Sequence, residues 1–216
     1  MGEQRATVAL LAGCVMGAAY GDTDRATARV LAANGCRVVT PAGQGCCGAL
    51  HSHRGELDGA RSLAKANIDA FEAAGVDAII ANAAGCGATM KHYAELFKDD
   101  AEYLPKAEAF AAKVKDFSEF LAANASALGV KDAPRKLLRM VPGLELREMA
   151  ESAMCCGSGA LYNVSQPEES QGLRTRKVRN AAKTEAQVIV TANPGCYIQL
   201  KQGVREQGAN LQVIHI

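Results

Sequence analysis

The most constraining feature of this sequence is a cysteine pattern that occurs twice. A Cys-Cys-Gly motif ends at Gly48 and recurs ending at Gly157, and each copy is followed by a distant Gly-Cys pair, at Cys86 and Cys196. The spacing agrees, because 38 residues lie between Cys47 and Cys86 and 39 lie between Cys156 and Cys196. The stretches AIIANAAGC and VIVTANPGC that end at these cysteines are also alike. We therefore expect two halves that repeat one design.

The first half alternates short apolar runs with amphipathic stretches. Apolar residues recur at helical spacing over residues 56–74, and Gly75 then stops the pattern. An order of strand, helix, strand, helix, strand implies a parallel α/β sheet with right-handed crossovers. The elements expected are strands over 8–11, 37–40 and 78–81, helices over 24–34, 56–74 and 88–97, and a helical stretch over 105–128.

The second half is expected to repeat the first incompletely. Cys14 lies 32 positions before Cys46, so its counterpart should fall near Ala123, but no cysteine occurs between Cys86 and Cys155. The second half therefore lacks its first strand and the cysteine that follows it. Its expected elements are helices over 134–141 and 167–183, a strand over 144–146, and a strand that leads into Cys196.

The predicted fold class is α/β, with two pseudo-repeated three-layer halves, short parallel sheets and cysteine loops at strand ends. The expected division is a first half over residues 1–104, a helical connector over 105–133 and a second half over 134–216.

Composition narrows the class of protein. Hydrophobic residues make up 49% and charged residues 22%, which favours a compact chain, and a net charge of +1 disfavours nucleic acid as a partner. The apolar run before Cys14 is too short for a signal peptide or a membrane span, so we expect a cytoplasmic protein. Because cytosolic thiols stay reduced, the eight cysteines are better interpreted as metal ligands or redox thiols than as disulfides.

Four cysteines of the first half are the strongest candidate ligands. They follow three predicted parallel strands, whose carboxyl ends meet at one crevice. Thiolates without accompanying histidines suit an iron–sulfur cluster or zinc. Ligands spread over about seventy residues favour the cluster, because structural zinc draws on close Cys-x-x-Cys pairs. Burial as small apolar residues would explain any single cysteine but not a repeated motif. The candidate set is Cys14, Cys46, Cys47 and Cys86.

Two other kinds of site are disfavoured. The glycine-rich stretch over residues 13–21 lacks the G-x-G-x-x-G spacing of a dinucleotide loop. Neither a nucleophile elbow nor an H-E-x-x-H motif of a hydrolase is present.

Several stretches together resemble a known family. They are LAGCVMGAAYGDTDRATARVLAANGCRVVTPAGQGCCGALHSHRGE, VDAIIANAAGCG, PRKLLRMVPGLEL, CCGSGALYNVSQPE and ANPGCYIQLK. In these stretches the chain is similar to the cysteine-rich CCG domains of the glycolate oxidase iron–sulfur subunit, and nearly the whole chain is covered. The lactate-oxidation iron–sulfur subunit and the catalytic subunit of heterodisulfide reductase carry the same domain.

The resemblance implies a non-flavin subunit of an oxidoreductase complex that oxidises glycolate, a 2-hydroxy acid. Electrons would come from a flavoprotein partner and pass to a further iron–sulfur protein or a membrane acceptor, which would place the chain peripherally at the inner face of the membrane. The cofactor implied is a [4Fe–4S] cluster on the first cysteine set, with the flavin on the partner. A second, incomplete set would comprise Cys155, Cys156 and Cys196.

The chain departs from its relatives in three ways. Heterodisulfide reductase ends each motif in Cys-x-x-Cys, but Ala83 and Asn193 stand at the earlier cysteine here. A ferredoxin-like domain is missing from this sequence, and so is a short strand before PRKLLR. The missing earlier cysteine disfavours disulfide cleavage, but two alternatives to electron transfer stay open. One is thiol or disulfide chemistry at an open cluster iron, and the other is a metal-free scaffold.

Overall fold

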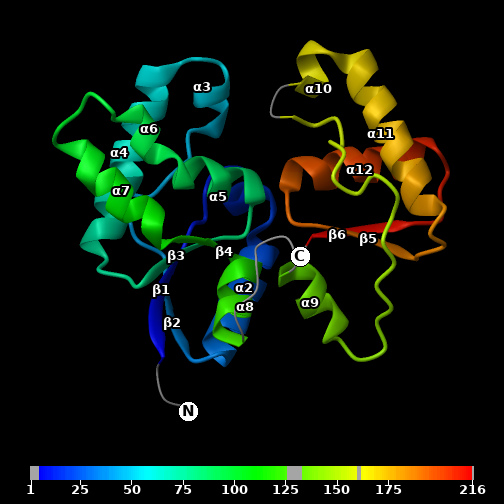
Figure 1. The fold of residues 1–216 in the computed structure, drawn as a ribbon, viewed down its shortest axis with the longest axis horizontal. Helices are drawn as coiled ribbons and strands as arrows, with labels where there is room; N and C mark the ends of the chain where they lie inside the picture. The colour runs from blue at the N-terminus through cyan, green and yellow to red at the C-terminus, as the bar shows by residue number, and fades with distance from the viewer. Residues whose placement is uncertain (1–4, 126–132, 160–161, 216) are drawn as a thin grey trace. The chain divides into compact units, whose positions relative to one another are not determined.

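The computed structural model describes residues 5–125, 133–159 and 162–215 (Figure 1). The chain forms two compact units, Met1–Leu137 and Leu138–Ile216. The sequence-based division at residues 104 and 133 stays a prediction. No helix of the described residues is both long and apolar enough to cross a membrane.

The first unit is built on a parallel sheet of four strands in the order β2-β1-β3-β4. Val8 of β1 lies between Val38 of β2 and Ala78 of β3, and Ile79 of β3 is aligned with Val114 of β4. Because this central pairing is parallel, β1, β2 and β3 all end at the same edge of the sheet. The strands are β1 (Ala6–Leu10), β2 (Cys36–Val39), β3 (Ala78–Ala81) and β4 (Val114–Asp116).

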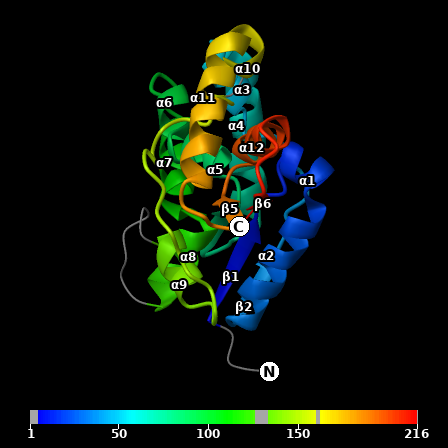
Figure 2. The same cartoon turned by 90° about the vertical axis from the view of Figure 1, so that its right-hand side faces the viewer.

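Helices cover both faces of this sheet, as alternating side chains of its strands require. Ala9 and Ile79 face a core that includes Phe71 and Phe110. Val8, Leu10 and Ile80 face the opposite core, which Leu31 and Phe117 complete. Figure 2 shows α2 running beside β1 and β2. The helices are α1 (Val15–Ala19), α2 (Gly21–Ala33), α3 (Ala49–His53), α4 (Leu57–Ala73), α5 (Ala84–Lys91), α6 (Tyr93–Leu96), α7 (Tyr103–Lys113) and α8 (Phe117–Ala125).

The predicted strands and the helices α2 and α4 of this unit are confirmed within a few residues. The helix expected over 88–97 was wrong in its start, because α5 begins at Ala84 and Cys86 lies in its first turn. The stretch over 105–128 was wrong as one helical segment, because β4 interrupts it and pairs with β3. Residues 126–128 of that stretch lie outside the described residues.

The second unit holds a two-stranded parallel sheet, in which Val188 is aligned with Gln212. Val178 and Leu200 pack with Ile189 and Val213 to form its core. Helix α9 spans the boundary between the two units. The elements are α9 (Ala133–Arg139), α10 (Tyr162–Ser165), α11 (Pro167–Ala182), β5 (Val188–Thr191), α12 (Pro194–Glu206) and β6 (Gln212–His215).

The strand predicted over residues 144–146 was wrong. This stretch has no regular structure, and Leu144 is exposed. Its neighbour Arg147 instead donates a hydrogen bond to the carbonyl oxygen of Thr184 at 2.9 Å. Two leucines around a solvated Glu145 bury too little apolar surface to add a third strand to the sheet.

The pseudo-repeat is confirmed in the backbone, with α4, β3 and α5 recurring as α11, β5 and α12. Gly75 and Glu185, each 11 residues before the Gly-Cys cysteine, have φ angles of 58° and 57°. Residues 133–159 and 162–187 contain no strand, but the first strand that the second half is expected to lack would precede α9, so its absence stays a prediction. Residues 128–132, in the segment LGVKDA before α9, lie outside the described residues.

Replacing Glu185 by glycine should stabilise the second unit. A side chain in the left-handed region costs about 1 kcal/mol or more, and the first unit has glycine at this position. We expect Glu185→Gly to raise the free energy of unfolding of the metal-free chain by about 1 kcal/mol in urea denaturation. Glu185→Ala loses the same weak ion pair with Arg147 but keeps a Cβ atom, so it should bring no such gain. Equal effects of the two variants would contradict this account.

Candidate metal centre

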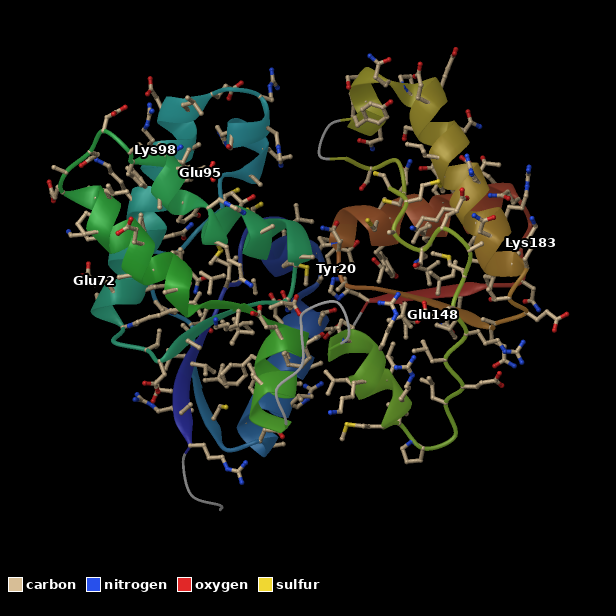
Figure 3. All side chains as sticks on the ribbon, in the orientation of Figure 1. Tyr20, Glu72, Glu95, Lys98, Glu148 and Lys183 are labelled. Atoms are coloured by element: carbon tan, nitrogen blue, oxygen red, sulfur yellow. The ribbon has the colours of Figure 1, made fainter. Side chains whose placement is uncertain are left out.

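The structure brings the four cysteines of the first set to one edge of the sheet. Cys14 follows β1 at the N-cap of α1, and Tyr20, labelled in Figure 3, separates α1 from α2. Cys46 and Cys47 lie in the loop after β2, and Cys86 lies in the first turn of α5, after β3. This confirms that three strand ends supply the four thiols.

The thiols meet in pairs. Cys14 Sγ lies 3.5 Å from Cys46 Sγ, and the Cys47 and Cys86 side chains are hydrogen-bonded to each other. Cys14 is exposed whereas Cys47 is buried, so the set reaches from the surface into the core. The backbone N–H of Gly48 donates to Cys46 Sγ at 3.5 Å, and the φ of 77° at Gly48 makes this turn possible.

Two buried polar side chains hold the loop from beneath. Asn67 of α4 accepts a hydrogen bond from Gly45 N and donates to the carbonyl oxygen of Cys46, both at 2.9 Å. The Tyr93 hydroxyl donates to the carbonyl oxygen of Cys47 at 2.9 Å and accepts a hydrogen bond from Asn67 at 3.1 Å. Both side chains are fully buried, which makes these bonds costly to lose.

A third side chain ties the loop to the central strand. The Gln44 amide accepts from Ala12 N at 2.9 Å and donates to the carbonyl oxygen of Leu10 at 3.1 Å. The loop after β2 is thereby fixed to the end of β1, where Cys14 follows.

The sequence reasoning missed Asn67, Tyr93 and Gln44. Asn67 offered one signal, because it is a polar residue on a helix face otherwise formed by small and apolar side chains such as Ala64 and Phe71. Tyr93 and Gln44 gave no such signal.

Hydrogen bonding and burial give the cysteines of the first set different thiol pKa values. The Cys86 side chain lowers the pKa of Cys47 to about 7, whereas its bond to Cys47, together with burial, raises the pKa of Cys86. Burial raises the pKa of Cys46 to about 11. Cys47 is therefore the thiolate of this set that forms most readily.

The second set repeats this geometry with three cysteines. Gly157, with φ of 89°, donates its N–H to Cys155 Sγ at 3.3 Å, and Cys156 Sγ lies 2.9 Å from Cys196 Sγ. Cys196 lies in the first turn of α12, where the Asn193 side chain caps the helix by accepting from Cys196 N at 3.3 Å. Asn193 thus fills a structural role at the position where the relatives with Cys-x-x-Cys have a cysteine.

The thiolate of the second set forms at still lower pH. The Cys196 thiol lowers the pKa of Cys156 to about 5, and Ser158, whose Oγ lies 3.2 Å from Cys156 Sγ, contributes to the shift. Bonding to Cys156 and burial raise the pKa of Cys196 in turn. Cys156 is buried, so this thiolate is held inside the unit.

The donor chemistry fits a soft, polynuclear metal centre. Each set offers one cysteine whose thiol pKa is lowered, a backbone N–H that donates to a sulfur, and partial exclusion of water. In the described part of the chain, no three Cys, His, Asp or Glu side chains converge as on a single metal ion. Sulfurs that meet in pairs suit a cluster that lies between its ligands better than one tetrahedral zinc.

Two other residues, Cys36 and His51, belong to neither cysteine set. Cys36 begins β2, where burial raises its thiol pKa. The His51 ring lies against Gly59, and its buried Nδ1 has no hydrogen-bond partner in the described residues.

The class of protein follows from these features, which are a repeated α/β unit with a Cys-Cys-Gly loop and a Gly-Cys pair in the first turn of a helix that follows a strand. A family model described as the cysteine-rich CCG domain matches residues 8–91 and again residues 121–201. The chain belongs to this family.

Curated relatives agree. The chain is 38% identical to the probable glycolate oxidase iron–sulfur subunit of Bacillus subtilis, over all of the chain and 54% of that protein. Lactate utilization protein A of Exiguobacterium sp. is 30% identical, over 97% of the chain and 94% of the relative. A subunit of the CoM/CoB fumarate reductase of Methanothermobacter marburgensis is 32% identical, over 97% and 45%. The chain thus spans about half the length of two of these proteins and nearly all of the third.

The thiol pKa values make a prediction for the metal-free chain. Ultraviolet thiolate absorbance should rise in one step near pH 5 and another near pH 7. Cys156→Ser should remove the lower step and Cys47→Ser the upper one, while Cys36→Ser, outside both sets, should leave both. Because the folded chain binds fewer protons than the unfolded chain above pH 5, its free energy of unfolding should rise with pH toward 9. Titration of all thiols near their ordinary pKa would contradict the pairing.

Proposed function

We propose that this chain is an iron–sulfur electron-transfer subunit of an oxidoreductase complex that oxidises a 2-hydroxy acid, glycolate or lactate. Electrons would arrive from a flavoprotein subunit and leave to a downstream acceptor, a further iron–sulfur protein or a membrane component. The observation that carries this proposal is the convergence of Cys14, Cys46, Cys47 and Cys86 from three parallel strand ends. The names of the glycolate oxidase and lactate utilization relatives support the substrate class.

In this proposal the chain's residues act by holding and shielding the centre. Cys14, Cys46, Cys47 and Cys86 would be its ligands, and a bound [4Fe–4S] cluster would supply a one-electron redox centre. The Gly48 N–H, which already donates to Cys46 Sγ, would stabilise negative charge on sulfur. Exposed Cys14 marks the side of the site that a partner could approach. The flavin would lie on the partner, and the chain would work in the cytoplasm, at the inner face of the membrane through its partners.

A second candidate function is thiol or disulfide chemistry at an open iron, and the incomplete second set favours it. In the described residues of the second unit, only Cys155, Cys156 and Cys196 provide thiols. Three protein ligands leave a position for an exogenous thiol. A change in the electron paramagnetic resonance signal on adding a thiol would support this candidate, and indifference to thiols would count against it.

Anaerobic reconstitution with iron and sulfide tests the main proposal. The wild-type chain should bind both and show the visible absorption of an iron–sulfur cluster. The double variant Cys46→Ser/Cys47→Ser should lose the iron held by the first set, because two of its four ligands are gone. Cys36→Ser makes the same chemical change outside the set and should bind iron as the wild type does.

Two results would sink the electron-transfer proposal. One is a wild-type chain that binds no iron, which would favour a metal-free scaffold that packs against a partner. The other is an unchanged iron content and spectrum in Cys46→Ser/Cys47→Ser.

A further inference from the structure

The residue that supports the cysteine loop from beneath differs between the two units. Lys177 of α11 lies 19 residues before Cys196, as Asn67 of α4 lies 19 residues before Cys86. Both residues are buried. In the repeat, Lys177 therefore stands where the first unit has the neutral Asn67.

Lys177 makes the same kind of contact with the loop as Asn67 does. Its ammonium Nζ donates to the carbonyl oxygen of Met154, the residue before Cys155, at 2.5 Å and to that of Ser152 at 2.9 Å. An ammonium is a donor only and carries a full charge, whereas an amide is neutral. The second loop is thus held by a buried positive charge.

This charge has no carboxylate at ion-pair distance within the described residues. The nearby buried cation on the same helix, Arg174, is compensated, because its Nη2 lies 2.6 Å from Glu206 Oε2. Lys177 instead contributes to the lowered pKa of Cys156, after the Cys196 and Ser158 hydrogen bonds. The anionic group that the Lys177 charge influences is therefore a thiolate of the second set.

Tyr93, the other side chain that holds the first loop, is also replaced in the second unit. Gly203 stands seven residues after Cys196, where Tyr93 stands seven after Cys86. A Cβ atom on Gly203 would lie 2.7 Å from Arg174 Cγ and 3.0 Å from Val178 Cγ2, so no tyrosine fits there. The neutral Asn-Tyr pair and the buried lysine are thus two alternative ways of holding one loop.

A fixed positive charge favours the more negative member of a redox pair, because reduction adds an electron to the centre. The ligand set works in the same direction, since three thiolates carry less negative charge than four. We propose that Lys177 is a positioning residue that raises the reduction potential of a centre on the second loop above that of the first centre. This inference rests on the proposed function, and it makes the second unit the one toward which electrons move.

The test uses the full chain with the first set broken by Cys46→Ser/Cys47→Ser, reconstituted anaerobically and titrated with electron paramagnetic resonance detection. Adding Lys177→Gln keeps a hydrogen-bond donor but removes the charge, so the potential should shift to more negative values. Lys177→Arg keeps the charge and should restore the parent potential. Lys183→Gln is the matched control, since Lys183, labelled in Figure 3, is an exposed residue near the C-terminal end of α11. It should leave the potential unchanged.

A comparison of the two centres and a folding measurement on metal-free chains distinguish an effect on the potential from a loss of structure. The potential of the Cys46→Ser/Cys47→Ser chain should be more positive than that of a Cys155→Ser/Cys156→Ser chain, which keeps only the first set. Circular dichroism and thermal unfolding of the metal-free Lys177 variants show whether each one folds.

Four results would overturn the inference. Equal potentials in the parent and Lys177→Gln would show that the charge has no effect. Unfolding of Lys177→Gln while Lys177→Arg folds would make Lys177 a structural residue only. Iron binding by the wild type and Cys155→Ser/Cys156→Ser, but not by Cys46→Ser/Cys47→Ser, would remove the second centre and leave the proposed function standing. A wild-type chain without iron would end both.

Discussion

The site in each unit depends on one interaction, the pairing of the second Cys-Cys-Gly cysteine with the cysteine in the first turn of the helix that follows the next strand. Cys156 and Cys196 approach to 2.9 Å, and Cys47 and Cys86 are joined in the same way. The loop can turn its sulfur inward only because the next residue is glycine in the left-handed region. At Gly157, a Cβ atom would lie 2.4 Å from the Ser170 carbonyl oxygen. The motif is therefore fixed by backbone geometry as well as by ligand chemistry.

The sequence predicts those helices and strands that a local apolar pattern or the repeat indicates without knowledge of tertiary contacts. Helix α4 and strand β3 have long or wholly apolar signals, and the structure has them within one or two residues of the expected bounds. Helix α11, whose buried face includes Ser170, Arg174 and Lys177, is instead predicted from the repeat. The three residues of β4 carry no such signal, because Lys115 and Asp116 are strand residues only by virtue of pairing with β3. The false strand over 144–146 is the converse case, an apolar pair with no neighbouring strand to join.

The cysteines of the site could also be predicted from the sequence. Cysteine is rare and its spacing repeats, so the convergence of the first set could be predicted from the parallel strand order alone. The side chains that hold the loop could not be found in this way. Nothing in the sequence around Tyr93 distinguishes it from an ordinary core tyrosine. Its hydroxyl reaches the Cys47 carbonyl oxygen only because α6 packs against the core. Such contacts are tertiary, and no local pattern encodes them.

The contrast between Asn67 and Lys177 bears on whether the second half still has a chemical role. A buried ammonium that lacks a carboxylate partner costs several kcal/mol of desolvation, which two carbonyl contacts only partly offset. A unit that served for packing alone would be more stable with a neutral side chain at Lys177, as in the first unit. Anionic sulfur nearby changes that balance, because it supplies the counter-charge that the described carboxylates do not. The buried lysine therefore argues that the second set of cysteines works as thiolates, and against the second half as a metal-free scaffold.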